Sequence, residues 1–137
     1  MLFRECAGGV VFYEDLVFLM KNEKGEWVLP KGKIRNGKLS SETALERVKI
    51  ETDIDAQIVS SLGETSYEFF SLTRKSPVTN KIDWYIMQAQ DGHFALNQTL
   101  QYSDGGYYPI DEALEKATYS QDKGLISIAY RRYKSNQ

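Results

Sequence analysis

The chain has 137 residues and a mass of 15.7 kDa, which suits one globular domain over residues 1–137. It is 42% hydrophobic and 26% charged, with a net charge of −2. This balance excludes a polybasic nucleic-acid-binding domain and an acidic disordered chain. Cys6 and His93 are the only residues of their kinds, so internal disulfides and zinc clusters are excluded, and a metal would need oxygen ligands, which favours Mg or Mn.

The first half of the chain predicts a hairpin and a helix. Apolar residues 10–12 and 16–20 indicate two strands, joined by a turn at Glu14-Asp15. The pair Gly8-Gly9 inside the first strand predicts a bulge or a close backbone approach. Residues 27–29 predict a short strand, followed by a loop over residues 31–38. Residues 40–52 have helical spacing of apolar positions, with Ser40 or Ser41 as the N-cap.

The second half predicts further strands and two final helices. Residues 57–75 and 81–90 are rich in β-formers, and residues 74–81 between them are expected to form a loop. Asp104-Gly105-Gly106 predicts a turn, and residues 111–117 and 121–133 predict helices. The fold class is therefore α+β. Glu14 and Asp15 interrupt the apolar start, so we expect no targeting or membrane segment and a cytoplasmic location.

The segment from Leu29 to Asp55 resembles the characteristic box of the Nudix superfamily. That box runs glycine, five residues, Glu, seven residues, Arg-Glu, an apolar residue, one residue, Glu-Glu, one residue, Gly and an apolar residue. With Gly32 as the first glycine, four of the nine fixed positions agree. The agreeing residues are Gly32, Val48, Glu51 and Ile54, and the five others are Lys38, Glu46, Arg47, Ile50 and Asp53. The box is therefore degenerate.

Four flanking segments extend the resemblance over nearly the whole chain. They are Ala7–Val11, Leu29–Gly32, Asn80–Tyr85 and Tyr107–Leu114. The segment Asn80–Tyr85 is similar to a strand of relatives that cleave dinucleoside polyphosphates, and the general layout is MutT-like. The resemblance implies a Nudix fold, an α/β/α sandwich with a central mixed β-sheet.

The resemblance also implies hydrolysis of diphosphate linkages by water, with divalent metal ions held by helix carboxylates. The positions where the family has Glu are here Lys38, Arg47, Ile50 and Glu51, which sum to a charge of +1 instead of −4. Glu51 and the Gly32 carbonyl are the candidate metal ligands, and Glu51, Glu46 and Arg47 are the candidate catalytic residues. Arg47 lies one helical turn from Glu51 and is expected to pair with it, whereas Glu46 is turned away by about 100°.

Cations around the box suggest that fixed positive charges replace the metal and bind phosphate directly. The candidate ligand-binding residues are Arg4, Lys21, Lys31, Lys33, Lys38, Tyr67, Phe69 and Lys81. Tyr67 and Phe69 are two residues apart on a strand, so they share one face and could stack a base. The simpler alternatives are a solvated basic surface and aromatic side chains that belong to the core.

Three functions follow as hypotheses. The first is binding of a nucleotide, a dinucleoside polyphosphate or another diphosphate-containing small molecule, with hydrolysis impaired by the lost glutamates. The second is an active Mg-dependent pyrophosphohydrolase, and the third is a non-catalytic scaffold for protein or RNA. We expect no membrane partner, and nucleic acid is disfavoured by the charge. The resemblance leaves a homodimer open, in which a partner chain could supply carboxylates.

Overall fold

A mixed β-sheet forms the middle of the structure, a computed structural model that describes residues 2–136. Its strands run in the spatial order β3-β2-β1-β6-β5, with β4 paired to β1 and β7 paired to β2. The strands are β1 Leu2–Tyr13, β2 Leu16–Lys21, β3 Trp27–Val28, β4 Lys31–Lys33, β5 Ala56–Ser71, β6 Ser76–Ala89 and β7 Asp104–Pro109. The parallel pairing of β1 with β6 makes the sheet mixed, because the other pairings are antiparallel.

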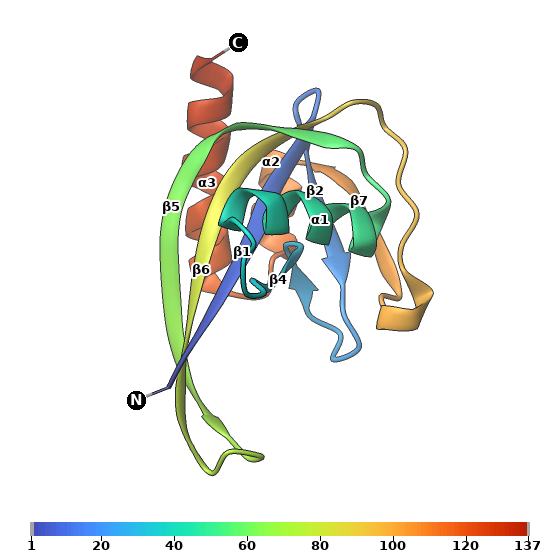
Figure 1. Cartoon of the computed structure of the whole chain (residues 1–137). Coiled ribbons are helices and arrows are strands. Elements are labelled where there is room, and N and C mark those ends of the chain that lie inside the picture. Colours follow the sequence, from blue (N-terminus) through green and yellow to red (C-terminus); the bar gives the residue numbers. More distant parts are fainter. Residues whose placement is uncertain (1, 137) are drawn as a thin grey trace.

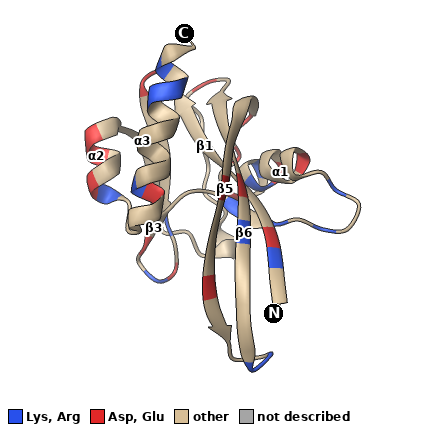
Figure 2. Ribbon diagram, turned by 90° about the vertical axis from the view of Figure 1, so that its left-hand side faces the viewer, with Lys and Arg blue, Asp and Glu red and all other residues tan. Residues whose placement is uncertain are grey.

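Helices cover both faces of this sheet. α1 (Ser40–Thr52) lies on one side, and α2 (Ile110–Lys116) and α3 (Ser120–Ser135) lie together on the other, as the edge-on view in Figure 2 shows. A short 3₁₀ helix, η1 (Gln98–Leu100), precedes β7. The expected α/β/α sandwich is confirmed. None of the helices within residues 2–136 combines the length and apolar character needed to cross a bilayer.

The central strand β1 supplies side chains to two hydrophobic cores. Val10 and Phe12 pack on the side of α2 and α3, whereas Ala7 and Val11 pack on the side of α1. This is the two-residue period of a strand that is buried on both faces. The predicted hairpin is present, with Tyr13 opposite Leu16 across a two-residue turn.

The close approach predicted at the first-strand glycines is present at Gly8. A Cβ on Gly8 would lie 2.6 Å from the Pro30 carbonyl oxygen and 2.8 Å from the Trp84 ring. The neighbouring Gly9 amide donates a hydrogen bond to the same carbonyl at 3.1 Å. The glycines therefore let the segment before β4 press against the sheet, which positions Gly32 beneath α1.

The predicted loop over residues 74–81 is wrong, because most of it is strand. β5 and β6 form a long hairpin that projects from the body of the molecule, at the bottom of Figure 1. Pro77 is tolerated because it precedes the point at which β1 joins β6, where Leu2 lies opposite Val78. Asn80 lies farther inside the sheet, between Arg4 of β1 and Tyr67 of β5.

Three smaller predictions also require correction. Residues 31–33 of the predicted loop form β4, and Asp104-Gly105-Gly106 begins β7 because it pairs with β2. The N-cap of α1 is Leu39 instead of Ser40 or Ser41, and its amide donates to the Glu42 carboxylate at 3.2 Å. The bounds of α1 itself are as predicted.

Candidate functional site

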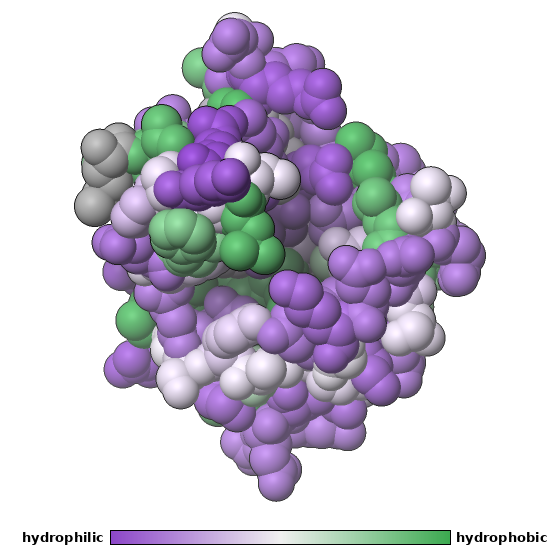
Figure 3. Space-filling model, turned by 90° about the horizontal axis from the view of Figure 1, so that it is seen from below, coloured by the Kyte–Doolittle hydropathy of each residue, from purple (hydrophilic) through white to green (hydrophobic). Residues whose placement is uncertain are grey.

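A groove of about 740 Å³ opens between the β5–β6 hairpin, the β2–β3 turn and the start of α3. Figure 3 views the molecule from the end where these segments lie, and the surface is hollowed near its centre. The floor includes the apolar side chains of Ile82 and Trp84. A groove with an apolar floor and several polar groups has the general character of a small-molecule site.

Three cations from different elements line this groove. They are Arg4 of β1, Lys24 of the β2–β3 turn and Lys31 of β4. None of the three forms an ion pair within the described part of the chain. They are available to bind an anion.

Two carboxylates share the groove with these cations. Glu26 accepts hydrogen bonds from the Tyr119 hydroxyl and, at 3.0 Å, from Asn22, and these bonds lower the pKa of Glu26. Burial raises the pKa of Asp122 on α3, although nearby Lys31 opposes that rise. Glu26 is therefore engaged by neutral donors rather than by the groove cations.

The groove also has an aromatic wall, made by Tyr67 and Phe69 of β5. Their ring centroids are 6.1 Å apart with an interplanar angle of 41°, and the Tyr67 side chain is 43% exposed. The predicted shared face of these two residues is present. Phe70 is 60% exposed and does not line the groove.

The degenerate box places a buried ion pair on α1. Arg47 donates to Glu51 Oε2 from one terminal nitrogen at 2.6 Å and from Nε at 3.1 Å. The Glu51 side chain is 1% exposed, and burial raises its pKa although Arg47 opposes the shift. The predicted pairing of these residues is therefore present.

Gly32 of β4 makes room for this pair. A Cβ on Gly32 would lie 2.6 Å from Cδ of Arg47, so the arginine crosses directly over the glycine. The first fixed glycine of the box thus accommodates a cation here.

Three other box residues, Lys38, Glu46 and Ile50, lie away from the Arg47–Glu51 pair. Glu46 forms an exposed ion pair with Lys38 at 2.9 Å, and Ile50 is 48% exposed. Among residues 2–136, no group of three or more His, Cys, Asp or Glu side chains is arranged to hold a metal ion. Oε2 of Glu51 is bound by Arg47, and Oε1 is buried without a hydrogen-bond partner, so one carboxylate oxygen of the box is left for Mg or Mn.

The remaining predicted ligand-binding residues lie outside the groove. Lys38 and Lys81 line a second hollow of about 260 Å³, together with Glu5, Glu64 and Asp83. Lys81 also lies over the Phe3 ring, 4.4 Å from its centroid. Lys33 is exposed on β4 and lines neither hollow.

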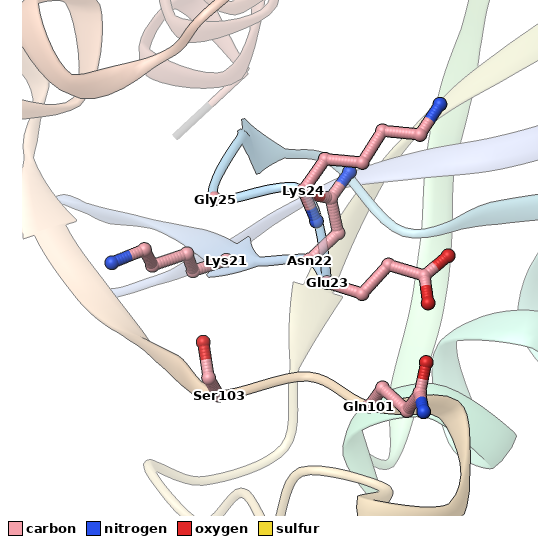
Figure 4. A pocket seen from close by; sticks show the side chains of 7 residues that line it. All are labelled: Lys21, Asn22, Glu23, Lys24, Gly25, Gln101 and Ser103. Atoms are coloured by element: carbon pink, nitrogen blue, oxygen red, sulfur yellow. The ribbon is translucent and has the colours of Figure 1, made fainter.

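Lys21 lines a third hollow, between the β2–β3 turn and the loop before β7. Figure 4 shows its side chain extending away from Lys24, while Glu23 extends toward the side of Gln101. Lys21, a candidate ligand-binding residue, therefore lies apart from the groove that Arg4 lines. Asn22 and Lys24 of the β2–β3 turn line both this hollow and the groove.

Sequence reasoning missed several groove residues, of which four matter here: Lys24, Glu26, Asn80 and Asp122. Asn80 had a detectable signal, because it alternates with apolar residues of β6 on the buried face. The other three come from a turn and a helix start, whose distance from β5 the local sequence does not encode.

Comparison with known proteins identifies the family. The NUDIX domain family model matches residues 2–127. A Mycobacterium tuberculosis (strain CDC 1551 / Oshkosh) protein that carries the name mutator protein MutT4 is 28% identical over 103 residues, which are 75% of this chain. The match spans only 40% of that relative's length.

Solved structures share the fold. A C. elegans Ap4A hydrolase binary complex has a TM-score of 0.73 at 15% identity, covering 98% of this chain and 99% of that one. The E. coli dihydroneopterin triphosphate pyrophosphohydrolase has a TM-score of 0.73 at 14% identity, with coverages of 92% and 95%. The MutT protein of Methanosarcina mazei Go1 has a TM-score of 0.74 at 14% identity, with coverages of 97% and 96%.

Proposed function

Because this chain belongs to the Nudix family, we propose that its groove binds a nucleotide or another ligand with a diphosphate linkage, and that hydrolysis of that linkage is impaired. The observation that carries the proposal is the combination of three unpaired cations, Arg4, Lys24 and Lys31, with an aromatic wall in one groove. Cations bind phosphate oxygens, and an aromatic ring stacks a base. The two parts together match a nucleotide.

The impairment is inferred from the donor set on α1. Nudix hydrolases generally use Mg or Mn. Here Arg47 binds the Glu51 carboxylate and Ile50 stands where a second carboxylate is expected. A divalent ion that neutralises developing phosphoryl charge would find one free carboxylate oxygen, Oε1 of Glu51, at the box positions of this helix. The fixed cations of the groove would still hold the ground-state phosphates.

Calorimetric titration tests the proposal. ADP, ATP and a diadenosine polyphosphate are titrated with Mg and then with a chelator, and the same samples are assayed for phosphate release. We expect binding that survives the chelator, without product. Mg-dependent turnover at an ordinary rate, abolished by Glu51→Gln, would establish an active pyrophosphohydrolase instead. No binding under either condition would refute the ligand proposal and favour a scaffold.

Two lysines of the same strand give a matched pair of variants. Lys31→Met removes a groove cation and is expected to weaken binding by about tenfold, which corresponds to about 1.4 kcal/mol. Lys33→Met removes an exposed cation outside the groove and should leave the dissociation constant unchanged. Equal effects of the two variants would mean that the lysines act only through net charge.

A further inference from the structure

A buried amide in the groove lacks a partner for its carbonyl oxygen. The Asn80 side chain lies on β6 with 3% exposure, lines the groove, and leaves Oδ1 without a hydrogen bond. Buried polar atoms in folded proteins are normally hydrogen-bonded, because desolvation without a partner costs free energy. An orphaned acceptor on a residue that lines a groove is therefore a candidate to accept a bond from a ligand.

The surroundings hold this amide in a defined orientation. Asn80 lies opposite Tyr67 in the β5–β6 register, and its Nδ2 donates to the Tyr67 hydroxyl at 2.6 Å. The same-face neighbours on β6 are Val78 and Ile82, which are buried and apolar. The Tyr67 bond occupies the amino side of the amide and leaves the carbonyl oxygen as the free group.

The aromatic wall lies beside this acceptor. Tyr67 both binds the Asn80 amide and packs against Phe69. A planar heterocycle stacked on this wall would therefore lie on the same strand pair as Asn80, which is opposite Tyr67. The only hydrogen-bonding group that this oxygen can recognise is a donor, such as an exocyclic amino group or a ring N–H.

We propose that Asn80 is a specificity-determining residue that reads the base of the bound nucleotide by accepting a hydrogen bond from its exocyclic amino group. The inference rests on the proposed nucleotide-binding function and adds a selection among bases. An amino-bearing base satisfies the buried oxygen, whereas a keto group at the same position places two acceptors together.

Pairs of nucleotides that differ in one amino group test the inference. The triphosphates ATP and ITP, GTP and ITP, and CTP and UTP are titrated into the wild-type protein in the presence of chelator. In at least one pair, we expect the amino-bearing nucleotide to bind about tenfold more tightly, as one net hydrogen bond allows. Equal affinities within every pair, or tighter binding of the nucleotide that lacks the amino group, would overturn the assignment.

Two variants test whether a preference among bases comes from the Asn80 amide. Asn80→Leu keeps a similar volume without the acceptor, and it should reduce the preference to within about twofold while the thermal midpoint stays at or above the wild-type value. Tyr67→Phe keeps the stacking ring but releases the amide, and it should reduce the preference partially. A preference that persists in Asn80→Leu would refute the role of Asn80.

The outcomes separate the two proposals. If no triphosphate binds the wild-type protein, the proposed function fails. If triphosphates bind but the base makes no difference, only the role of Asn80 fails. Asn36→Leu, an exposed substitution in the loop before α1, is the control for a change of Asn to Leu outside the groove.

Discussion

Removing Arg47 should destabilise the fold through the buried Glu51 carboxylate. Breaking a buried ion pair leaves an uncompensated charge, which typically costs about 3–5 kcal/mol. Because the Arg47 side chain is 26% exposed and water screens part of the interaction, we expect Arg47→Ala to cost about 2–3 kcal/mol at pH 7. For a chain of this length, that loss lowers Tm by about 6–12 °C.

The cost of this substitution should depend on pH with a defined sign. Burial raises the pKa of Glu51, and Arg47 is the largest opposing cause, so its removal raises that pKa further. A carboxyl group with a raised pKa in the folded state favours folding fully below its unfolded pKa of about 4.3, and this contribution is lost as pH rises through the folded-state pKa. The difference between Arg47→Ala and wild type should therefore be small near pH 4 and should grow until Glu51 is ionised.

Chemical denaturation from pH 4 to pH 8 measures this difference. The double variant Arg47→Ala/Glu51→Gln should recover most of the lost stability at pH 8 and remove the additional pH dependence, because no buried charge remains. Lys38→Ala, which breaks an exposed ion pair of the same segment, is the matched control and should not change the unfolding free energy measurably. A pH-independent loss in Arg47→Ala would refute the argument from the buried carboxylate.

Three further predictions concern packing, groove charge and the box. Gly8→Ala should lower the unfolding free energy by about 1–3 kcal/mol, because the new Cβ would overlap a backbone carbonyl oxygen. Gly124→Ala in α3 should raise the unfolding free energy by about 0.5–1 kcal/mol, because a Cβ there meets no atom within 4 Å and alanine favours the helix. Denaturation curves measure both changes. Asp122→Asn should tighten nucleotide binding about fivefold at pH 8, because it removes one repulsive charge from the groove, and less at acidic pH because the pKa of Asp122 is raised. Arg47→Glu combined with Ile50→Glu should place two new carboxylates beside Glu51, at three box positions of α1, and produce a Mg-dependent rise in Tm that wild type lacks; no gain would contradict the register of the box.

Local patterns predicted α1 and the β1–β2 hairpin because their defining contacts are close in sequence. The 3.6-residue period and a two-residue turn suffice for such elements. β4 and the first half of β7, Asp104–Gly106, were missed because their pairing partners are distant: Gly32 lies opposite Ala7, and Gly106 lies opposite Leu19. Glycine-rich segments have weak strand propensity, and pairing in the sheet overrides it.

The residues of the site likewise fall into those predicted from local spacing and those placed only by the tertiary structure. The Arg47–Glu51 pair follows from the spacing of four residues on a helix. The aromatic face of Tyr67 and Phe69 follows from the two-residue period of a strand. Lys24 could not be assigned to the groove, because its position depends on how the β2–β3 turn lies relative to β5 in three dimensions.

α1 differs from the family pattern in two ways, by the loss of metal-binding glutamates and by the gain of Arg47, and these two changes are physically coupled. Glu51 is fully buried, so its ionised form needs a neutralising cation. In a site that holds a divalent ion, the positive charge of the metal would stabilise a glutamate in place of Arg47. Without a metal, that glutamate and Glu51 would be like charges one turn apart, which destabilises a helix. Arg47 removes that repulsion and supplies the neutralising charge within the chain, and Gly32 provides the space for it. The arginine therefore compensates electrostatically for the loss of the metal ligands and preserves the fold. Because Arg47 neutralises Glu51, the groove cations stay free for a ligand.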